Sequence, residues 1–193
     1  TLSLIVFFDC IAEFGFSIWL PSFLKEERNF SIAQAGIIAS MWGVGQFFGR
    51  PLLGLLSDRT GYRHVGTPAA FVMGLSFFFI VKSQAYSSFI FWQLIAGFIG
   101  GALMGSLWTF TAVFYGKKKG TALGLVSNLG NTGSVVAPVA GGYLADRYSL
   151  ETSLVIMGLV PSILCSLLFL SSFIWVKENV RTWDKDKAPA HGG

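Results

Sequence analysis

The stretch GRPLLGLLSDRTGYRH, residues 49–64, begins as an apolar segment and ends in a cluster of charge. Its first half carries Pro51 and Gly54 among leucines, and its second half brings Asp58, Arg59 and Arg63 close together. A charged cluster directly after a long apolar run is typical of a helix that leaves a lipid bilayer. The stretch therefore predicts the end of a membrane-spanning helix.

The composition of the whole chain agrees with this interpretation. Of the 193 residues, 53% are hydrophobic and only 12% are charged, whereas a soluble domain carries about 25% charged residues. A bilayer crossing takes about 20 mostly apolar residues, so the length allows about six or seven spans and no large soluble domain. The net charge is +4, but most basic residues flank apolar runs, which argues against a nucleic-acid-binding surface.

Six apolar segments can be distinguished along the chain. Helices are expected for all of them, because lipid cannot satisfy an open backbone and the runs do not alternate as barrel strands do. The sequence predicts an all-α membrane protein, with Ser31 as the N-cap of the second helix. The expected spans are residues 4–20, 31–56, 66–81, 87–114, 122–144 and 154–176, followed by a polar cytoplasmic tail at 177–193.

Basic residues are unequally shared between the two sides of these spans, with nine on one side, four on the other and Arg50 inside a span. Such an excess marks the cytoplasmic side, so both ends of the segment are expected in the cytoplasm, and the protein in a plasma membrane of the bacterial inner-membrane type. The richer side carries Arg59, Arg63, Lys117, Lys118, Lys119, Lys177, Arg181, Lys185 and Lys187, and the poorer side Lys25, Arg28, Lys82 and Arg147.

A short internal sequence repeat relates the second and fifth segments. Residues 51–59 read PLLGLLSDR and residues 138–147 read PVAGGYLADR. One Asp-Arg pair is expected inside and the other outside, which is what two three-helix repeats of opposite orientation produce. We therefore expect six transmembrane helices arranged as two inverted three-helix repeats.

The opening stretch also resembles the loop motif of the major facilitator superfamily, G-x-L-x-D-[RK]-x-G-[RK]-[RK]. Tyr62 departs from the pattern. The resemblance implies a gating latch in which Asp58 pairs with a nearby arginine or caps a neighbouring helix. The alternative is that the charges only anchor the helix end. The matching residues are Gly54, Leu56, Asp58, Arg59, Gly61 and Arg63.

The fifth segment is similar to the glycine-rich helix of the same family, G-x8-G-x3-G-P-x2-G-G. The resemblance implies a helix that packs closely and bends at a moving interface, although packing and a kink at the proline would explain the residues equally well. The matching residues are Gly124, Gly133, Pro138, Gly141 and Gly142, with Ala137 in place of one glycine.

Family members usually have twelve spans in two halves, so the chain resembles one six-helix half. In first halves the fourth span usually carries an arginine in R-x-x-[QA]-G, and here Gln93 takes that position. This departure, with the polar tail, favours the C-terminal half. The other half would then lie in the same chain or in a partner chain; a six-span homodimer is the alternative.

Two acids in the first segment, Asp9 and Glu13, are the strongest candidates for the solute path. They lie four residues apart and so on one helical face. A carboxylate at membrane depth is costly and usually faces a cavity or a partner. One of them, Glu13 for preference, is expected to bind a proton or to set substrate charge; Asp9 could instead reach the cytoplasmic interface.

Other polar residues within the spans complete the predicted path. Arg50 could bind a substrate anion, pair with Asp9 or reach the interface. GRP at 49–51 resembles second halves of organic-anion carriers, a further pointer to an anion. Core packing and interhelical hydrogen bonds are the alternatives for the remaining candidates, which are Gln46, Gln93, Trp108, Asn128 and Asn131.

The sequence thus predicts a secondary active transporter working by alternating access, with proton-coupled uptake of an organic anion as the preferred version. Efflux by antiport, or a non-transporting receptor or assembly protein, are the alternatives. The expected partners are lipid, a small-molecule substrate and a coupling proton or cation, with no nucleic acid. No phosphate-binding loop or enzyme motif occurs, no metal or cofactor is expected, and Cys10 and Cys165 are expected to be buried free thiols.

Overall fold

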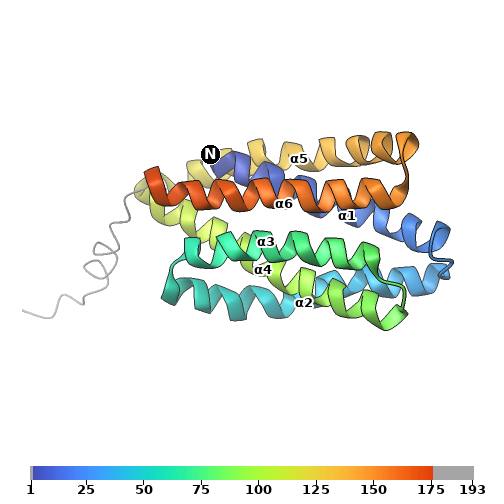
Figure 1. The fold of residues 1–193 in the computed structure, drawn as a ribbon. Coiled ribbons are helices and arrows are strands. Elements are labelled where there is room, and N and C mark those ends of the chain that lie inside the picture. Colours follow the sequence, from blue (N-terminus) through green and yellow to red (C-terminus); the bar gives the residue numbers. More distant parts are fainter. Residues whose placement is uncertain (1, 176–193) are drawn as a thin grey trace, which may run out of the picture.

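The structure is a computed structural model that describes residues 2–175, and the predicted tail lies outside these residues. The described part is helical and runs back and forth along one axis (Figure 1). Its elements are α1 (Leu2–Glu26), α2 (Ile32–Thr60), α3 (Tyr62–Lys82), α4 (Tyr86–Tyr115), a short 3-10 helix η1 (Gly116–Lys118), α5 (Lys119–Arg147) and α6 (Leu150–Trp175).

Helix α2 begins and ends at residues whose chemistry explains the boundary. The predicted N-cap is confirmed: the Gln34 N–H donates to Ser31 Oγ at 3.2 Å, and the Ser31 N–H donates to Gln34 Oε1 at 3.0 Å. The helix continues through Asp58 and stops at Gly61, whose φ of 93° lies in the left-handed region that favours glycine. The loop expected at 57–64 is therefore reduced to one residue, because its polar residues extend the two helices.

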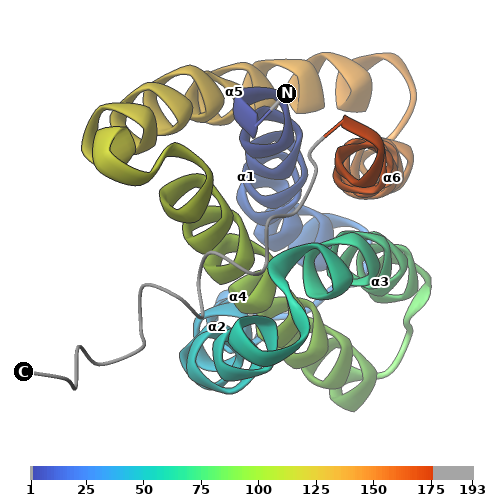
Figure 2. The same cartoon turned by 90° about the vertical axis from the view of Figure 1, so that its left-hand side faces the viewer.

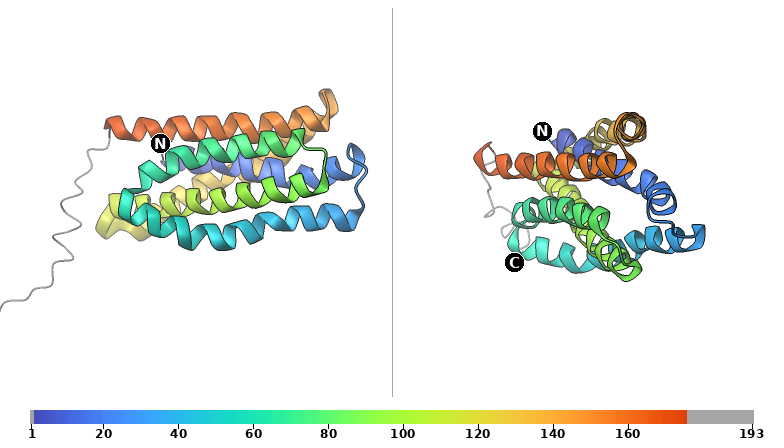
Figure 3. Two further views of the ribbon diagram at one scale, coloured as in Figure 1. Left: turned by 60° about the horizontal axis from the view of Figure 1, so that its bottom comes forward. Right: turned by 45° about the vertical axis from the view of Figure 1, so that its right-hand side comes forward.

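The two three-helix repeats, α1–α3 and α4–α6, follow one packing scheme, in which the second and third helices of each repeat pack on the first helix of the other. Helices α2 and α3 pack on α4, while α5 and α6 pack on α1, and α3 and α6 contact each other (Figure 2). Since each repeat has three helices, the second runs in the opposite direction to the first, and Figure 3 shows the helices side by side along the common axis. The expected fold class, two inverted three-helix repeats, is confirmed.

Glycines bring helices of different repeats into backbone contact at two places, between α2 and α4 and between α5 and α1. A Cβ at Gly45 or Gly49 of α2 would overlap backbone atoms of Leu94 or Phe98 in α4. In the other pair, a Cβ at Gly133 of α5 would overlap the carbonyl of Phe7 in α1. Close backbone packing at small residues is the usual way in which helices associate tightly in a membrane.

The glycine-rich motif of α5 is used in this contact only in part. Trp19 of α1 covers Gly141 and Gly142, and its indole N–H donates to the Pro138 carbonyl at 3.1 Å. Ala137 is fully buried. By contrast, a Cβ at Gly124 would meet nothing within 4 Å. The second half of the motif therefore holds α5 against α1, whereas Gly124 faces open space.

Four of the described helices are long and apolar enough to cross a membrane by length and composition, namely residues 2–26, 64–82, 86–112 and 150–173. Helices α2 and α5 are long enough but less apolar, because they carry more glycine and more polar side chains. They also expose large apolar side chains such as Phe47 and Val139, each about three-quarters exposed. Their exposed surface thus mixes apolar and polar side chains, which fits helices that border a solute path.

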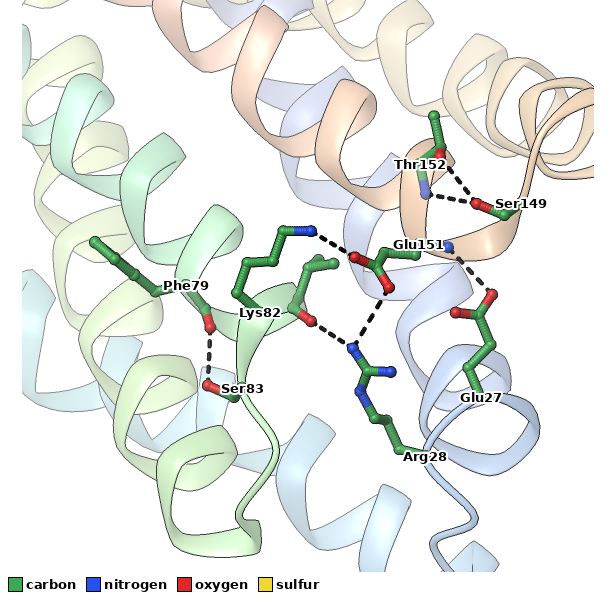
Figure 4. A network of polar contacts seen from close by, with 9 residues as sticks. Glu27, Arg28, Phe79, Lys82, Ser83, Ser149, Glu151 and Thr152 are labelled. Atoms are coloured by element: carbon green, nitrogen blue, oxygen red, sulfur yellow. Dashed lines mark hydrogen bonds and ion pairs between the residues drawn. The ribbon is translucent and has the colours of Figure 1, made fainter.

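A polar cluster ties three helix ends together at the end of the bundle opposite Gly61 (Figure 4). The Lys82 ammonium lies 2.6 Å and the Arg28 guanidinium 3.5 Å from the Glu151 carboxylate. Arg28 also donates to the Val81 carbonyl at 2.9 Å, and the Glu151 N–H donates to Glu27 Oε1 at 3.3 Å. The cluster links the end of α1, the end of α3 and the start of α6, and so both repeats.

The backbone contact between α2 and α4 predicts opposite effects at two glycines of one helix. Gly49→Ala should destabilise the protein by about 1–3 kcal/mol, because a methyl group has no room beside Phe98. Gly36→Ala, where a Cβ meets nothing within 4 Å, should be neutral or stabilising by up to about 1 kcal/mol. Thermal unfolding of the purified full-length protein in detergent measures both, and equal effects would contradict the packing described.

The polar cluster predicts a modest, salt-dependent contribution to stability. Because Lys82 and Glu151 are partly exposed, Glu151→Gln should cost no more than about 1 kcal/mol, or a few degrees of Tm. The loss should shrink at high salt. A double-mutant cycle with Lys82→Gln checks the pair, and strict additivity of the two changes would exclude their coupling.

Candidate functional site

A cavity of about 380 Å³ opens between four helices, two from each repeat. Helix α1 contributes a carboxylate, α2 a guanidinium, α4 a mainly apolar wall and α5 an amide. The lining residues are Cys10, Glu13 and Phe14 of α1, Arg50 of α2, Met104, Gly105 and Trp108 of α4, and Asn131 of α5.

Glu13 is the centre of the polar contacts at this cavity. It lies near the middle of α1 and is half-buried. Its Oε1 accepts from the Trp42 indole N–H at 3.1 Å and from the Gln46 amide at 3.3 Å. Two donors from α2 therefore hold one carboxylate oxygen of α1, and the second oxygen takes no part in these bonds.

Arg50 is connected to Glu13 through the same amide. Its Nη2 donates to Gln46 Oε1 at 2.8 Å. Trp42, Gln46 and Arg50 are spaced four residues apart and so form one stripe along α2. A Cβ at Gly101 of α4 would come within 3.1 Å of Arg50 Cγ, so this glycine leaves room for the stem of the arginine.

Trp42 was not predicted as a site residue, yet packing fixes its indole in place. The ring stacks on Phe77 with centroids 5.7 Å apart, and a Cβ at Gly100 would come within 2.9 Å of it. A cue was available in the sequence, because Trp42 begins the four-residue spacing that leads through Gln46 to Arg50.

A weaker set of polar contacts lies where α1 and α5 border the cavity. Cys10 Sγ donates to Asn131 Oδ1 at 3.5 Å, and Asn131 Nδ2 donates to Ser127 Oγ at 3.2 Å. Cys10 and Cys165 are both buried and free, as expected. Asn131 is itself exposed, so its amide remains accessible from the cavity.

The structure brings together most, but not all, of the predicted path residues. Glu13, Arg50, Trp108 and Asn131 line the cavity, and Gln46 bridges the first two.

The other three candidates lie elsewhere. Asp9 is 2% exposed and its Oδ2 has no hydrogen-bond partner among the described residues, while Gln93 is 1% exposed within α4. Asn128 lies on an exposed face of α5 and outside the cavity lining.

The loop motif lies at the end of the bundle away from the polar cluster. Asp58 and Arg59 are exposed in the last turn of α2, and the side chain of Arg63, one expected partner of Asp58, lies outside the described part of the structure. Ser57 accepts from Ser106 Oγ at 3.1 Å, which ties this end of α2 to α4.

The lining of the cavity combines charged, polar and aromatic groups. Within residues 2–175, no group of three or more His, Cys, Asp and Glu side chains could hold a metal ion. The cavity instead offers one carboxylate, one guanidinium, one amide and an aromatic wall. These groups can bind a small polar solute reversibly.

A family comparison agrees with the six-helix scheme. The family model for the Major Facilitator Superfamily matches residues 2–191. The chain belongs to the Major Facilitator Superfamily. The family and the apolar helices identify a multi-pass membrane protein, as the sequence predicted.

Several members of the superfamily are similar to this chain over most of its length. The Probable galactarate/D-glucarate transporter GudP of Escherichia coli (strain K12) is 30% identical over 67% of the chain and 30% of the relative. The Sialic acid transporter NanX of the same strain is 29% identical over 87% of the chain and 43% of the relative. The Multidrug resistance protein MdtG of Salmonella choleraesuis (strain SC-B67) is 28% identical over 75% and 35%. The chain therefore spans less than half the length of these relatives.

The cavity predicts which introduced cysteines react from water. After replacement of the native cysteines, Asn131→Cys in the full-length protein should react quickly with a small charged methanethiosulfonate reagent. Gln93→Cys should react slowly, because Gln93 is buried within α4. Labelling rates measured by mass spectrometry check this pair, and equal rates would show that the lining is wrongly assigned.

Proposed function

We propose that this superfamily member carries a small organic anion together with a proton, by alternating access in a plasma membrane. The observation that supports this most strongly is the pairing of one acid and one cation at a single cavity. Glu13 and Arg50 both line it and are connected through Gln46.

Arg50 is the proposed anion-binding group. A guanidinium stays charged at any physiological pH and matches the planar geometry of a carboxylate. Arg50 is exposed and is the one cation among the lining residues of the described cavity. Galactarate, D-glucarate and sialic acid, which appear in the names of GudP and NanX, are all carboxylic acids. Trp108 and Asn131 would contact the rest of such a solute.

Glu13 is the proposed proton site. An ionisable residue within a span is expensive to keep and commonly marks an ion or proton pathway. Glu13 combines such a position with access to the cavity, whereas Asp9 is buried in the core. A proton bound at Glu13 would neutralise the only acid of the described lining and leave Arg50 as an uncompensated positive charge for the anion.

The six helices would perform this task as one half of a larger transporter, the C-terminal half in our proposal. Symmetric halves that rock about a shared central site are the general basis of alternating access in this superfamily. The loop motif at Asp58 and Arg59 and the open surface of α5 at Gly124 would form contacts that change as the halves move. Both ends of this segment, with residues 177–193, would lie in the cytoplasm.

Efflux of an organic solute is the second candidate, and it is supported by two observations. MdtG, whose name denotes multidrug resistance, is similar over 75% of the chain. The α4 wall presents Met104 and Trp108 beside Phe14 of α1, a surface that also suits an apolar solute. The two candidates differ in whether Arg50 is required and in the direction of net transport.

Transport by the full-length protein in liposomes tests the proposal. With radiolabelled D-glucarate and sialic acid as probes and an inward proton gradient, Arg50→Gln should reduce uptake at least about tenfold, the typical loss of one charge-assisted contact. The matched control Arg147→Gln, at an exposed helix end, should leave uptake unchanged. Undiminished uptake by Arg50→Gln would refute the anion role, and export of lipophilic cations in its place would favour efflux.

A further inference from the structure

We propose that Gln46 is a positioning residue that makes anion binding at Arg50 depend on proton binding at Glu13. This inference rests on the proposed function and assigns to one amide the coupling between its two binding groups. The geometry that points to it is a single side chain in contact with both charges. Gln46 Nε2 donates to Glu13, and Gln46 Oε1 accepts from Arg50.

The orientation of the amide follows from the charges on either side of it. An ionised carboxylate can only accept hydrogen bonds, and a guanidinium can only donate them. The amide must therefore turn its NH₂ group to Glu13 and its oxygen to Arg50, because the reverse orientation would create two repulsive contacts. With Glu13 ionised, Gln46 thus holds Arg50 in a chain of charge-assisted hydrogen bonds that ends at the Glu13 carboxylate.

Protonation of Glu13 removes the negative end of this chain. The Trp42 indole can only donate, so it keeps Glu13 Oε1 as an acceptor, and the proton belongs on the other oxygen. The bond from Gln46 to Oε1 then loses its charge assistance and weakens, as does its hold on Arg50. The guanidinium becomes available to a substrate carboxylate, so the proton favours the anion, and by linkage the anion favours the proton by the same factor.

Few other charged groups can influence this exchange. On α1, Asp9 lies one turn from Glu13 and Cys10 lies beside it, and on α2 the charged neighbour is Arg50. Helix α4 contains no charged residue, and those of α3, α5 and α6 lie near the helix ends. The α6 thiol of Cys165 is turned away and donates to the Ile5 carbonyl at 3.7 Å. The coupling is therefore assigned to the stripe on α2.

Equilibrium binding of D-glucarate and sialic acid to the full-length protein in nanodiscs, measured across acidic to neutral pH, tests this assignment. The wild-type affinity should rise by about tenfold as the pH falls. Glu13→Gln should bind tightly at every pH. Gln46→Met, which keeps the length but not the amide, should bind with a pH dependence reduced to about twofold. Asn128→Ala, at an exposed amide outside the cavity, should keep the full wild-type dependence.

The outcomes separate this inference from the function on which it rests. A full pH dependence in Gln46→Met, with none in Glu13→Gln, would overturn the role of Gln46 and leave proton-coupled anion binding intact. Equal binding by wild type and Arg50→Gln, or none by wild type, would overturn both. If Gln46→Met does not fold, Gln46→Asn provides the second test. Its shorter amide cannot reach both charges, so a reduced dependence is again expected and a full one would contradict the inference.

Discussion

The backbone contact between α2 and α4 is the constraint on which the site depends. Gly45 and Gly49 of α2 lie against Leu94 and Phe98 of α4, where no side chain could fit. With this face of α2 committed to α4, the stripe of Trp42, Gln46 and Arg50 is directed toward α1 and meets Glu13. In a bilayer, where lipid competes with helices for apolar contact, such close packing is what fixes the rotation of a helix.

The same arrangement explains how charged groups persist inside an apolar bundle. Glu13 is stabilised by two donors from α2, and Arg50 by an amide that itself contacts Glu13. Both charged side chains, Glu13 and Arg50, thus have a hydrogen-bond partner in Gln46. A connection of this kind is weaker than an ion pair, and it leaves the guanidinium accessible to a solute while keeping it under the influence of the acid.

Much of the fold could be predicted from the sequence because lipid restricts the choices. Long apolar runs must form helices, and two repeats that each contain an odd number of helices must run in opposite directions across the membrane. The two family motifs then identified the superfamily. Part of the site followed as well, since polar residues within spans are rare, and Glu13, Arg50, Trp108 and Asn131 do share a cavity.

The remaining details depended on helix rotation, which sequence alone does not give. Asp9 and Glu13 share one helical face by spacing, yet Asp9 turns into the core while Glu13 reaches the cavity. Trp42 was missed because its role arises from an indole N–H that only packing on Gly100 and Phe77 brings to Glu13. The extent of α2 through Asp58 likewise depended on Gly61, where a single residue makes the turn.

The most direct test of proton and anion sharing one cavity is proton movement in de-energised vesicles that contain the full-length protein. On addition of D-glucarate or sialic acid, the outside medium should become alkaline as protons enter with the solute, and Glu13→Gln should abolish this change while still exchanging labelled solute. Solute entry without any proton movement in the wild type, or unchanged proton movement in Glu13→Gln, would contradict the account.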